Sequence, residues 1–185
     1  MKWGLLTWAT VLFPTILGAG PALAERLEIQ PRGSEWRFVG DSVMGGVSEG
    51  TLRHETVVGR PAARLTGVVS LENNGGFIQI TLDLDTHELL DASDWDGLEI
   101  DVFGNGEQYN LHLRTDAVRR PWQSYRQSFS ATRTWQRIRL PFAGFAPHRM
   151  ETPLDTRKLV RLGIVAIGRR FEADIAIGGV WLYRD

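Results

Sequence analysis

Short segments in which every second residue is apolar run through most of the chain, and this pattern is what most constrains the fold. In one segment Leu98, Ile100 and Val102 alternate with Glu99 and Asp101. A β-strand points successive side chains to opposite faces, so this period is typical of a strand with one buried and one solvated face. Further strand-like segments, separated by clusters of Gly, Asn, Asp and Pro, cover residues 63–71, 78–82, 109–113, 122–129, 135–140, 162–167 and 173–183.

Short strands at this spacing, with no long helical period between most of them, predict an all-β fold of two antiparallel sheets packed as a sandwich. Helix is expected only in brief connectors. One would run from Thr86 to Ala92, and another from Thr156 to Val160, where Asp155 could cap the first turn.

The first 24 residues have the pattern of a secretory signal peptide. Lys2 supplies the positive charge, residues 5–17 the apolar stretch, and Ala22-Leu23-Ala24 the small residues of a cleavage site. A retained membrane anchor is the alternative, but Pro14 and Gly18 interrupt the apolar run, which is shorter than the roughly 20 residues of a spanning helix. We therefore expect cleavage before Glu25, export to the periplasm, and a single domain over residues 25–185.

The composition excludes several kinds of chemistry. The chain has no cysteine, so thiol catalysis, thiolate metal sites and disulfides are excluded, and the fold must rest on its core. The formal net charge is −1. This balance gives no reason to expect a nucleic acid or an anionic membrane as a partner.

Two glycine-rich segments lie between strand-like segments. They are residues 39–48, with Gly45-Gly46, and residues 72–77, with Asn73-Asn74-Gly75-Gly76. Glycine and asparagine tolerate the left-handed backbone of tight turns, and glycine also permits close backbone approach. The segments could be sharp corners of the sandwich or ordered loops that contact a ligand.

These segments, together with several others, resemble the complex I intermediate-associated protein 30 family. The residues that carry the resemblance are Asp41-Ser42-Val43-Met44-Gly45-Gly46, Asn73-Asn74-Gly75-Gly76-Phe77, Leu113-Arg114-Thr115-Asp116, Trp135 with Leu140-Pro141-Phe142, Phe145-Ala146-Pro147, and Leu162-Gly163. The resemblance extends from about Trp36 to Trp181. It implies a galactose-binding-like jelly-roll sandwich, similar in architecture to carbohydrate-binding modules. It also implies a non-enzymatic role, since the family's best-known members help to assemble respiratory complex I.

A polar face is predicted from residues that share one parity on different strands. They are Glu99 and Asp101, then Asn110, His112 and Arg114, then Ser124 and Arg126. If these strands are neighbours, the face could bind a sugar, because hydroxyl groups need fixed donors and acceptors and the ring of nearby Trp122 could cover an apolar sugar face. The alternative is an ordinary solvated face with cross-strand ion pairs.

Catalytic patterns are weak. Residues 46–50 match the nucleophile elbow around Ser48, but the alternating segment that follows favours a strand where the elbow requires a helix. The four histidines, His54, His87, His112 and His148, lack the spacing of a zinc site. An acidic loop of Asp91, Asp94 and Asp96 could hold calcium or form a turn capped by aspartates, and we favour the capped turn. No enzyme activity, metal or cofactor is expected.

The sequence therefore predicts an exported, non-catalytic binding or assembly protein, and the alternative is a carbohydrate-binding module for periplasmic glycan. The partner is a protein or a glycan. The expected contact residues on the glycine loops are Asp41, Met44, Gly45, Gly46, Asn73, Asn74, Gly75 and Gly76. Those on the polar face are Asn110, His112, Arg114, Asp116, Trp122 and Arg126.

Overall fold

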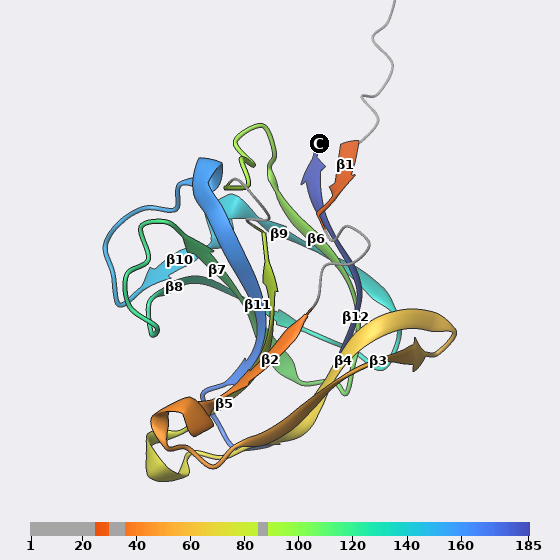
Figure 1. The fold of residues 1–185 in the computed structure, drawn as a ribbon. Coiled ribbons are helices and arrows are strands. Elements are labelled where there is room, and N and C mark those ends of the chain that lie inside the picture. Colours follow the sequence, from red (N-terminus) through yellow and green to blue (C-terminus); the bar gives the residue numbers. More distant parts are fainter. Residues whose placement is uncertain (1–24, 30–35, 85–88) are drawn as a thin grey trace, which may run out of the picture.

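Two antiparallel sheets make up the protein in the computed structural model, which describes residues 25–29, 36–84 and 89–185 (Figure 1). Sheet A has the strand order β3-β4-β12-β6-β9, and β1 also pairs with β12. Sheet B has the order β10-β8-β7-β11-β5-β2. The all-β sandwich expected from the alternating segments is confirmed.

The elements of sheet A are β1 (Glu25–Glu28), β3 (Glu49–Val57), β4 (Arg60–Val69), β6 (Gly97–Gly104), β9 (Gln136–Pro141) and β12 (Phe171–Arg184). Those of sheet B are β2 (Arg37–Gly40), β5 (Phe77–Asp83), β7 (Gln108–Thr115), β8 (Ser124–Ser130), β10 (Ala146–His148) and β11 (Leu159–Ile167). Four short 3-10 helices connect them: η1 (Asp41–Met44), η2 (Glu72–Asn74), η3 (Phe142–Gly144) and η4 (Thr156–Lys158).

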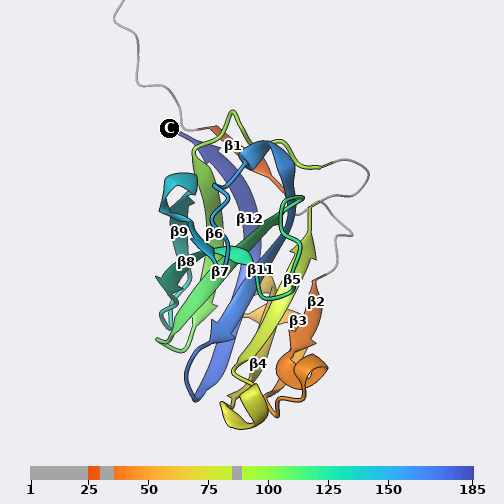
Figure 2. The same cartoon turned by 90° about the vertical axis from the view of Figure 1, so that its left-hand side faces the viewer.

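The two sheets lie one in front of the other in Figure 2, and the core between them consists of the apolar residues of the alternating segments. Leu65 of β4, Ile100 of β6 and Ile175 of β12 have no exposed surface, and neither have Leu111 of β7 and Ile164 of β11. Burial of such side chains contributes about 1.5 to 3 kcal/mol each. Because the inward-pointing residues of the strands form the core, the polar residues that alternate with them lie on the outer faces of the two sheets.

The predicted connectors are partly correct. The turn after Asp155 is η4, and the Asp155 carboxylate accepts a hydrogen bond from the backbone N–H of Arg157 at 3.1 Å, as a cap should. The helix predicted for residues 86–92 is wrong where the structure describes it, at residues 89–92. There Leu90 exchanges backbone hydrogen bonds with Leu159 of β11, and this extended bridge replaces a helical turn.

Residues 1–24, the predicted signal peptide, lie outside the described residues, and so does His87. Among the residues that the structure does describe, no helix has the length and apolar character needed to cross a membrane.

Candidate functional site

The two glycine loops meet at one end of the sandwich, where both views show η1 and η2 next to each other (Figures 1 and 2). The carboxylate of Asp41, which has no exposed surface, joins them. Its Oδ2 accepts hydrogen bonds from the backbone N–H of Gly76 at 2.6 Å and from the Ser48 hydroxyl at 2.5 Å. Its Oδ1 accepts one from the backbone N–H of Ser48 at 3.0 Å. The carboxylate thus connects residues that are 35 positions apart in the chain.

The glycines leave room for this buried carboxylate. A Cβ atom on Gly46 would lie 2.4 Å from Cγ of Asp41, and one on Gly75 would lie 2.5 Å from Oδ2. Asn73 and Asn74 take the left-handed backbone, at φ values of 55° and 58°, which asparagine tolerates better than most residues. The motif residues therefore form a hydrogen-bonded cluster around Asp41, which we call the Asp41 network, and Met44 is exposed on its surface. A ligand-binding role for these loops stays a prediction.

Ser48 also belongs to the Asp41 network. It precedes β3, so the turn leads into a strand and not into the helix of a nucleophile elbow. Besides donating to Asp41, its Oγ accepts a hydrogen bond from the backbone N–H of Ser70 at 2.9 Å. The hydroxyl therefore fixes three chain segments together.

The polar face is built on neighbouring strands of sheet B. His112 of β7 lies opposite Arg126 of β8, and Asn110 lies opposite Ser128, whose hydroxyl donates to the Asn110 side-chain oxygen at 3.0 Å. Across β11, His112 lies opposite Gly163. The structure thus brings Asn110, His112, Arg114, Ser124 and Arg126 to one sheet, and we call the outer side of β8, β7 and β11 the sheet B face.

Two residues assigned to this face by parity are elsewhere. Glu99 and Asp101 are on β6 of sheet A, where Arg137 lies 3.3 Å and 3.1 Å from their carboxylates. Parity states which side of a strand a residue occupies but not which sheet the strand joins, so the placement on one common face was wrong.

Two further predicted residues lie at the margin of the sheet B face. Trp122, in the loop between β7 and β8, is 49% exposed, with the Arg120 guanidinium 6.0 Å from its ring centre. Asp116, just after β7, forms an ion pair with Lys158 at 3.4 Å. Trp122 remains available to a ligand, whereas Asp116 already has a cation beside it.

Other residues of this face were not singled out from the sequence. Gly163 lies in the middle of it, between His112 on β7 and Thr81 on β5. A side chain at this position would approach Gln79, since a Cβ would lie 3.1 Å from Oε1. Arg161 and Asp83 lie opposite each other on β11 and β5 and form an ion pair at 2.5 Å. Their alternation with Leu162 and Leu82 was visible in the sequence, but the adjacency of the strands was not.

His112 is the most perturbed titratable group of the face. Burial, together with the neighbouring charges of Arg126, His148 and Arg114, lowers its pKa from 6.5 to about 3. Its Nε2 is buried without a hydrogen-bond partner among the described residues. The imidazole is therefore neutral at physiological pH, and it can contribute a hydrogen bond to a ligand but not a charge.

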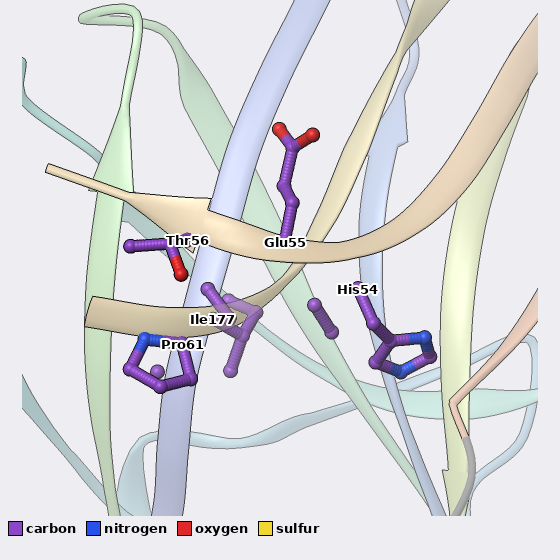
Figure 3. Close-up of a pocket in the computed structure, with 8 residues that line it drawn as sticks. His54, Glu55, Thr56, Pro61 and Ile177 are labelled. Atoms are coloured by element: carbon purple, nitrogen blue, oxygen red, sulfur yellow. The ribbon is translucent and has the colours of Figure 1, made fainter. Parts of the chain in front are cut away.

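A separate hollow of about 420 Å³ lies on sheet A, lined by residues of β3, β4 and β12 (Figure 3). Figure 3 shows His54 and Glu55 leaving β3 in different directions, so they do not converge on one point. The Glu55 carboxylate is 2.8 Å from Nη1 of Arg64. Since most of the lining is apolar or already paired, the sheet B face is the better candidate site.

The acidic loop has the geometry of a capped turn. Asp91 accepts a hydrogen bond from the backbone N–H of Ser93 at 2.9 Å, and Asp96 accepts one from the backbone N–H of Asp185 at 2.9 Å. Within residues 25–29, 36–84 and 89–185, no three His, Asp or Glu side chains are grouped as metal ligands would be.

Comparison with protein families matches residues 27–177 to the model of complex I intermediate-associated protein 30. The chain belongs to this family. The resemblance noted in the sequence motifs is thereby confirmed over most of the chain. A search of curated protein sequences finds no match.

Several solved structures that match this chain are carbohydrate-binding modules. A family 11 module of the cellulosomal cellulase Lic26A-Cel5E of Clostridium thermocellum has a TM-score of 0.69 and 10% identity, over 88% of this chain and 95% of that one. The family 11 module from Clostridium thermocellum in complex with a β-1,3-1,4-mixed-linked tetrasaccharide has a TM-score of 0.67 and 11% identity, over 86% of this chain and 94% of that one. A family 30 module has a TM-score of 0.62 and 16% identity, over 85% of this chain and 87% of that one. At these identities the likeness establishes the galactose-binding-like sandwich fold alone.

Acid denaturation tests the stabilising role of the Asp41 network. Burial raises the pKa of the Asp41 carboxyl, but hydrogen bonds from the Ser48 hydroxyl and from the backbone N–H groups of Gly76, Ser48 and Phe77 lower it by more than burial raises it. The net pKa therefore lies below the ordinary value of 3.8. The stabilisation is therefore complete above about pH 4 and is lost as the pH falls through the folded-state pKa. We expect Asp41→Asn to lower the free energy of unfolding by about 3 kcal/mol at pH 7, because buried N–H donors lose their acceptor.

Urea denaturation between pH 7 and pH 2 measures this effect. The variant should lose part of the decline in stability below pH 4 that the parent protein shows. Asp94→Asn, at an exposed aspartate, is the control and should stay within about 0.5 kcal/mol of the parent at pH 7. Equal stability of Asp41→Asn and the parent protein would contradict the structural role of the Asp41 network.

The lowered pKa of His112 gives a second prediction. An unfolded chain takes up this proton near pH 6.5 and the folded chain only near pH 3, so His112 makes the protein less stable as the pH falls through that interval. We expect the His112 ring resonances in an NMR titration to show no inflection between pH 8 and pH 5. The same histidine in denaturant should titrate near 6.5. An inflection above pH 5 in the folded protein would show that the imidazole is not buried as described.

Proposed function

We propose that this chain is an exported, non-catalytic binding domain that takes a glycan on the sheet B face. The observation that carries the proposal is the row of half-buried polar side chains across β7 and β8, namely Asn110, His112, Arg114 and Arg126. They are held in register by the sheet, so a ligand does not have to order them, which reduces the entropic cost of binding.

The chemistry of the face suits a saccharide. The Asn110 amide and the neutral His112 ring are directional hydrogen-bond partners for hydroxyl groups. The exposed Trp122 ring at the margin offers an apolar surface for the C–H groups of a sugar ring. The fold shared with carbohydrate-binding modules, one of them in complex with a tetrasaccharide, supports this proposal.

A protein partner is the second candidate, and a different surface favours it. On the first glycine loop, and at the residue directly before the second, apolar side chains are exposed: Val43, Met44 and Leu71 are 73%, 54% and 54% exposed. The Asp41 network holds the two glycine loops at the same end of the sandwich. Exposed apolar side chains on ordered loops are typical of protein contact sites, and membership of a family described as complex I intermediate-associated is consistent with an assembly role.

Glycan binding can separate the two candidates. On an array of plant, algal and bacterial glycans we expect saturable binding, which Asn110→Ala should weaken about three- to tenfold through loss of one hydrogen bond. Val43→Ser, on the exposed glycine loop, should leave it unchanged. If no glycan binds the folded protein, and a crosslinked protein partner from the native cell is lost in Val43→Ser but retained in Asn110→Ala, the second candidate replaces the first.

Export rests on the pattern of residues 1–24 and has its own test. When the full chain is expressed in a bacterium, the protein recovered from the periplasmic fraction should begin at Glu25 in N-terminal sequencing. Replacing Ala24 by Asp removes the small residue at the cleavage site and should prevent processing. Recovery of the uncleaved chain from the cytoplasm alone would contradict export.

A further inference from the structure

Arginines on the outer side of sheet A are paired with carboxylates. Arg64 contacts Asp174 and Glu55, each at 2.8 Å. Glu99, only 1% exposed, lies 2.6 Å from Arg26 and 2.9 Å from Arg139, and it also contacts Arg137. On this side most of the described arginines, though not Arg53, therefore have a carboxylate partner within the chain.

The sheet B face differs, because Arg114 and Arg126 form no ion pair with any described residue. Nη1 of Arg114 donates to the backbone carbonyls of Pro121 and Gln123, at 3.2 Å and 3.1 Å. Nε of Arg126 donates to the Ser124 hydroxyl at 2.9 Å. A guanidinium has five N–H donors, so both side chains are oriented by neutral acceptors and retain donors for a further partner.

The surroundings of these two arginines are also positive. Burial and the charge of Arg161 lower the pKa of Arg114, and burial and the charge of Arg149 lower the pKa of Arg126. Each guanidinium is therefore partly removed from water and lies near one other arginine, Arg161 or Arg149. An opposite charge placed there would be favoured on both counts.

Acids on the neighbouring elements are already paired. Asp83 contacts both Arg37 and Arg161, and Asp116 contacts Lys158. Burial and the nearby arginines lower the pKa of both His112 and His148. The two imidazoles beside Arg126 are therefore neutral and leave the positive charge of the arginines unchanged. Although the whole chain has a net charge of −1, this face is positive.

We propose that the saccharide bound by the sheet B face is acidic, and that Arg114 and Arg126 bind its carboxylate groups. The inference rests on the proposed function and adds the class of sugar. Arginine suits this task because its planar donors match the two oxygens of a carboxylate. Asn110 and Trp122 beside the arginines supply the contacts for hydroxyl groups and ring C–H groups that a simple anion would not use, which favours a uronic-acid saccharide over inorganic phosphate.

Calorimetric titration with two saccharides of matched length tests the inference. One is an oligogalacturonate, which carries a carboxylate on each sugar, and the other is a neutral mixed-linked β-glucan oligosaccharide. We expect the acidic saccharide to bind at least about tenfold more tightly at low salt, and its affinity to fall as NaCl is raised, since salt screens charges near the surface.

Variants locate the charge that is responsible. Arg126→Gln and Arg114→Gln should each weaken binding of the oligogalacturonate by about tenfold or more, because each removes a charged hydrogen-bond donor. Arg53→Gln is the matched control. Arg53 is an exposed arginine of β3 on sheet A with no described ion pair, and its loss changes the net charge equally. Thermal melts establish that all three variants are folded.

The possible failures are distinct. Equal binding of the neutral and acidic saccharides, unaffected by Arg126→Gln, would overturn the acidic class but leave the glycan-binding function in place. Absence of binding to either saccharide and to the glycan array would overturn both. Binding to phosphatidylglycerol vesicles or to inorganic phosphate as strong as binding to the oligogalacturonate would show that the face recognises anions without recognising sugar.

Discussion

Packing of the two sheets against each other is the constraint on which the rest of the structure depends. The chain has no cysteine, so the sandwich is held by the apolar residues between the sheets and by hydrogen bonds within them. The longer strands give alternate residues to this core, among them Leu111 and Leu113 of β7 and Tyr125 of β8, all fully buried. The residues between them are thereby fixed in position on the outer faces, where they can serve another purpose.

The two outer faces serve different purposes. On sheet A, arginines and carboxylates from neighbouring strands pair across the surface, with Glu99 at the centre of three arginines. Such pairs satisfy one another and contribute modestly to stability. On sheet B, Arg114 and Arg126 are held by backbone carbonyls and a serine hydroxyl, and their charge has no described counterpart. This difference, more than the fold, is why we assign ligand binding to sheet B.

Much of this could be predicted from local sequence. The period of two identified most of the strands and their inward sides, but not the short strands β1, β2 and β10, and Asp155 marked the start of η4. Long-range relations could not be predicted. Glu99 has the same alternation as His112, yet β6 joins sheet A, and only the strand order shows it. The role of Asp41 was hidden for the same reason, because its partners Gly76 and Phe77 are contributed by a distant loop.

The glycine motifs and the candidate binding face are separate parts of the molecule, whereas two other family motifs place Arg114 and Gly163 on that face. The glycine motifs surround the buried Asp41 carboxylate and preserve a corner of the sandwich, whereas the sheet B face is built mainly from β7, β8 and β11. The match to the family covers both regions and names no ligand for either.

NMR mapping of backbone amides during titration with an oligogalacturonate shows whether a ligand binds to the sheet B face. We expect the shifted resonances to cluster at His112, Arg126 and Gly163 and at their neighbours on β7, β8 and β11. Shifts concentrated instead on β3 and β4, around the hollow of His54 and Glu55, would contradict it.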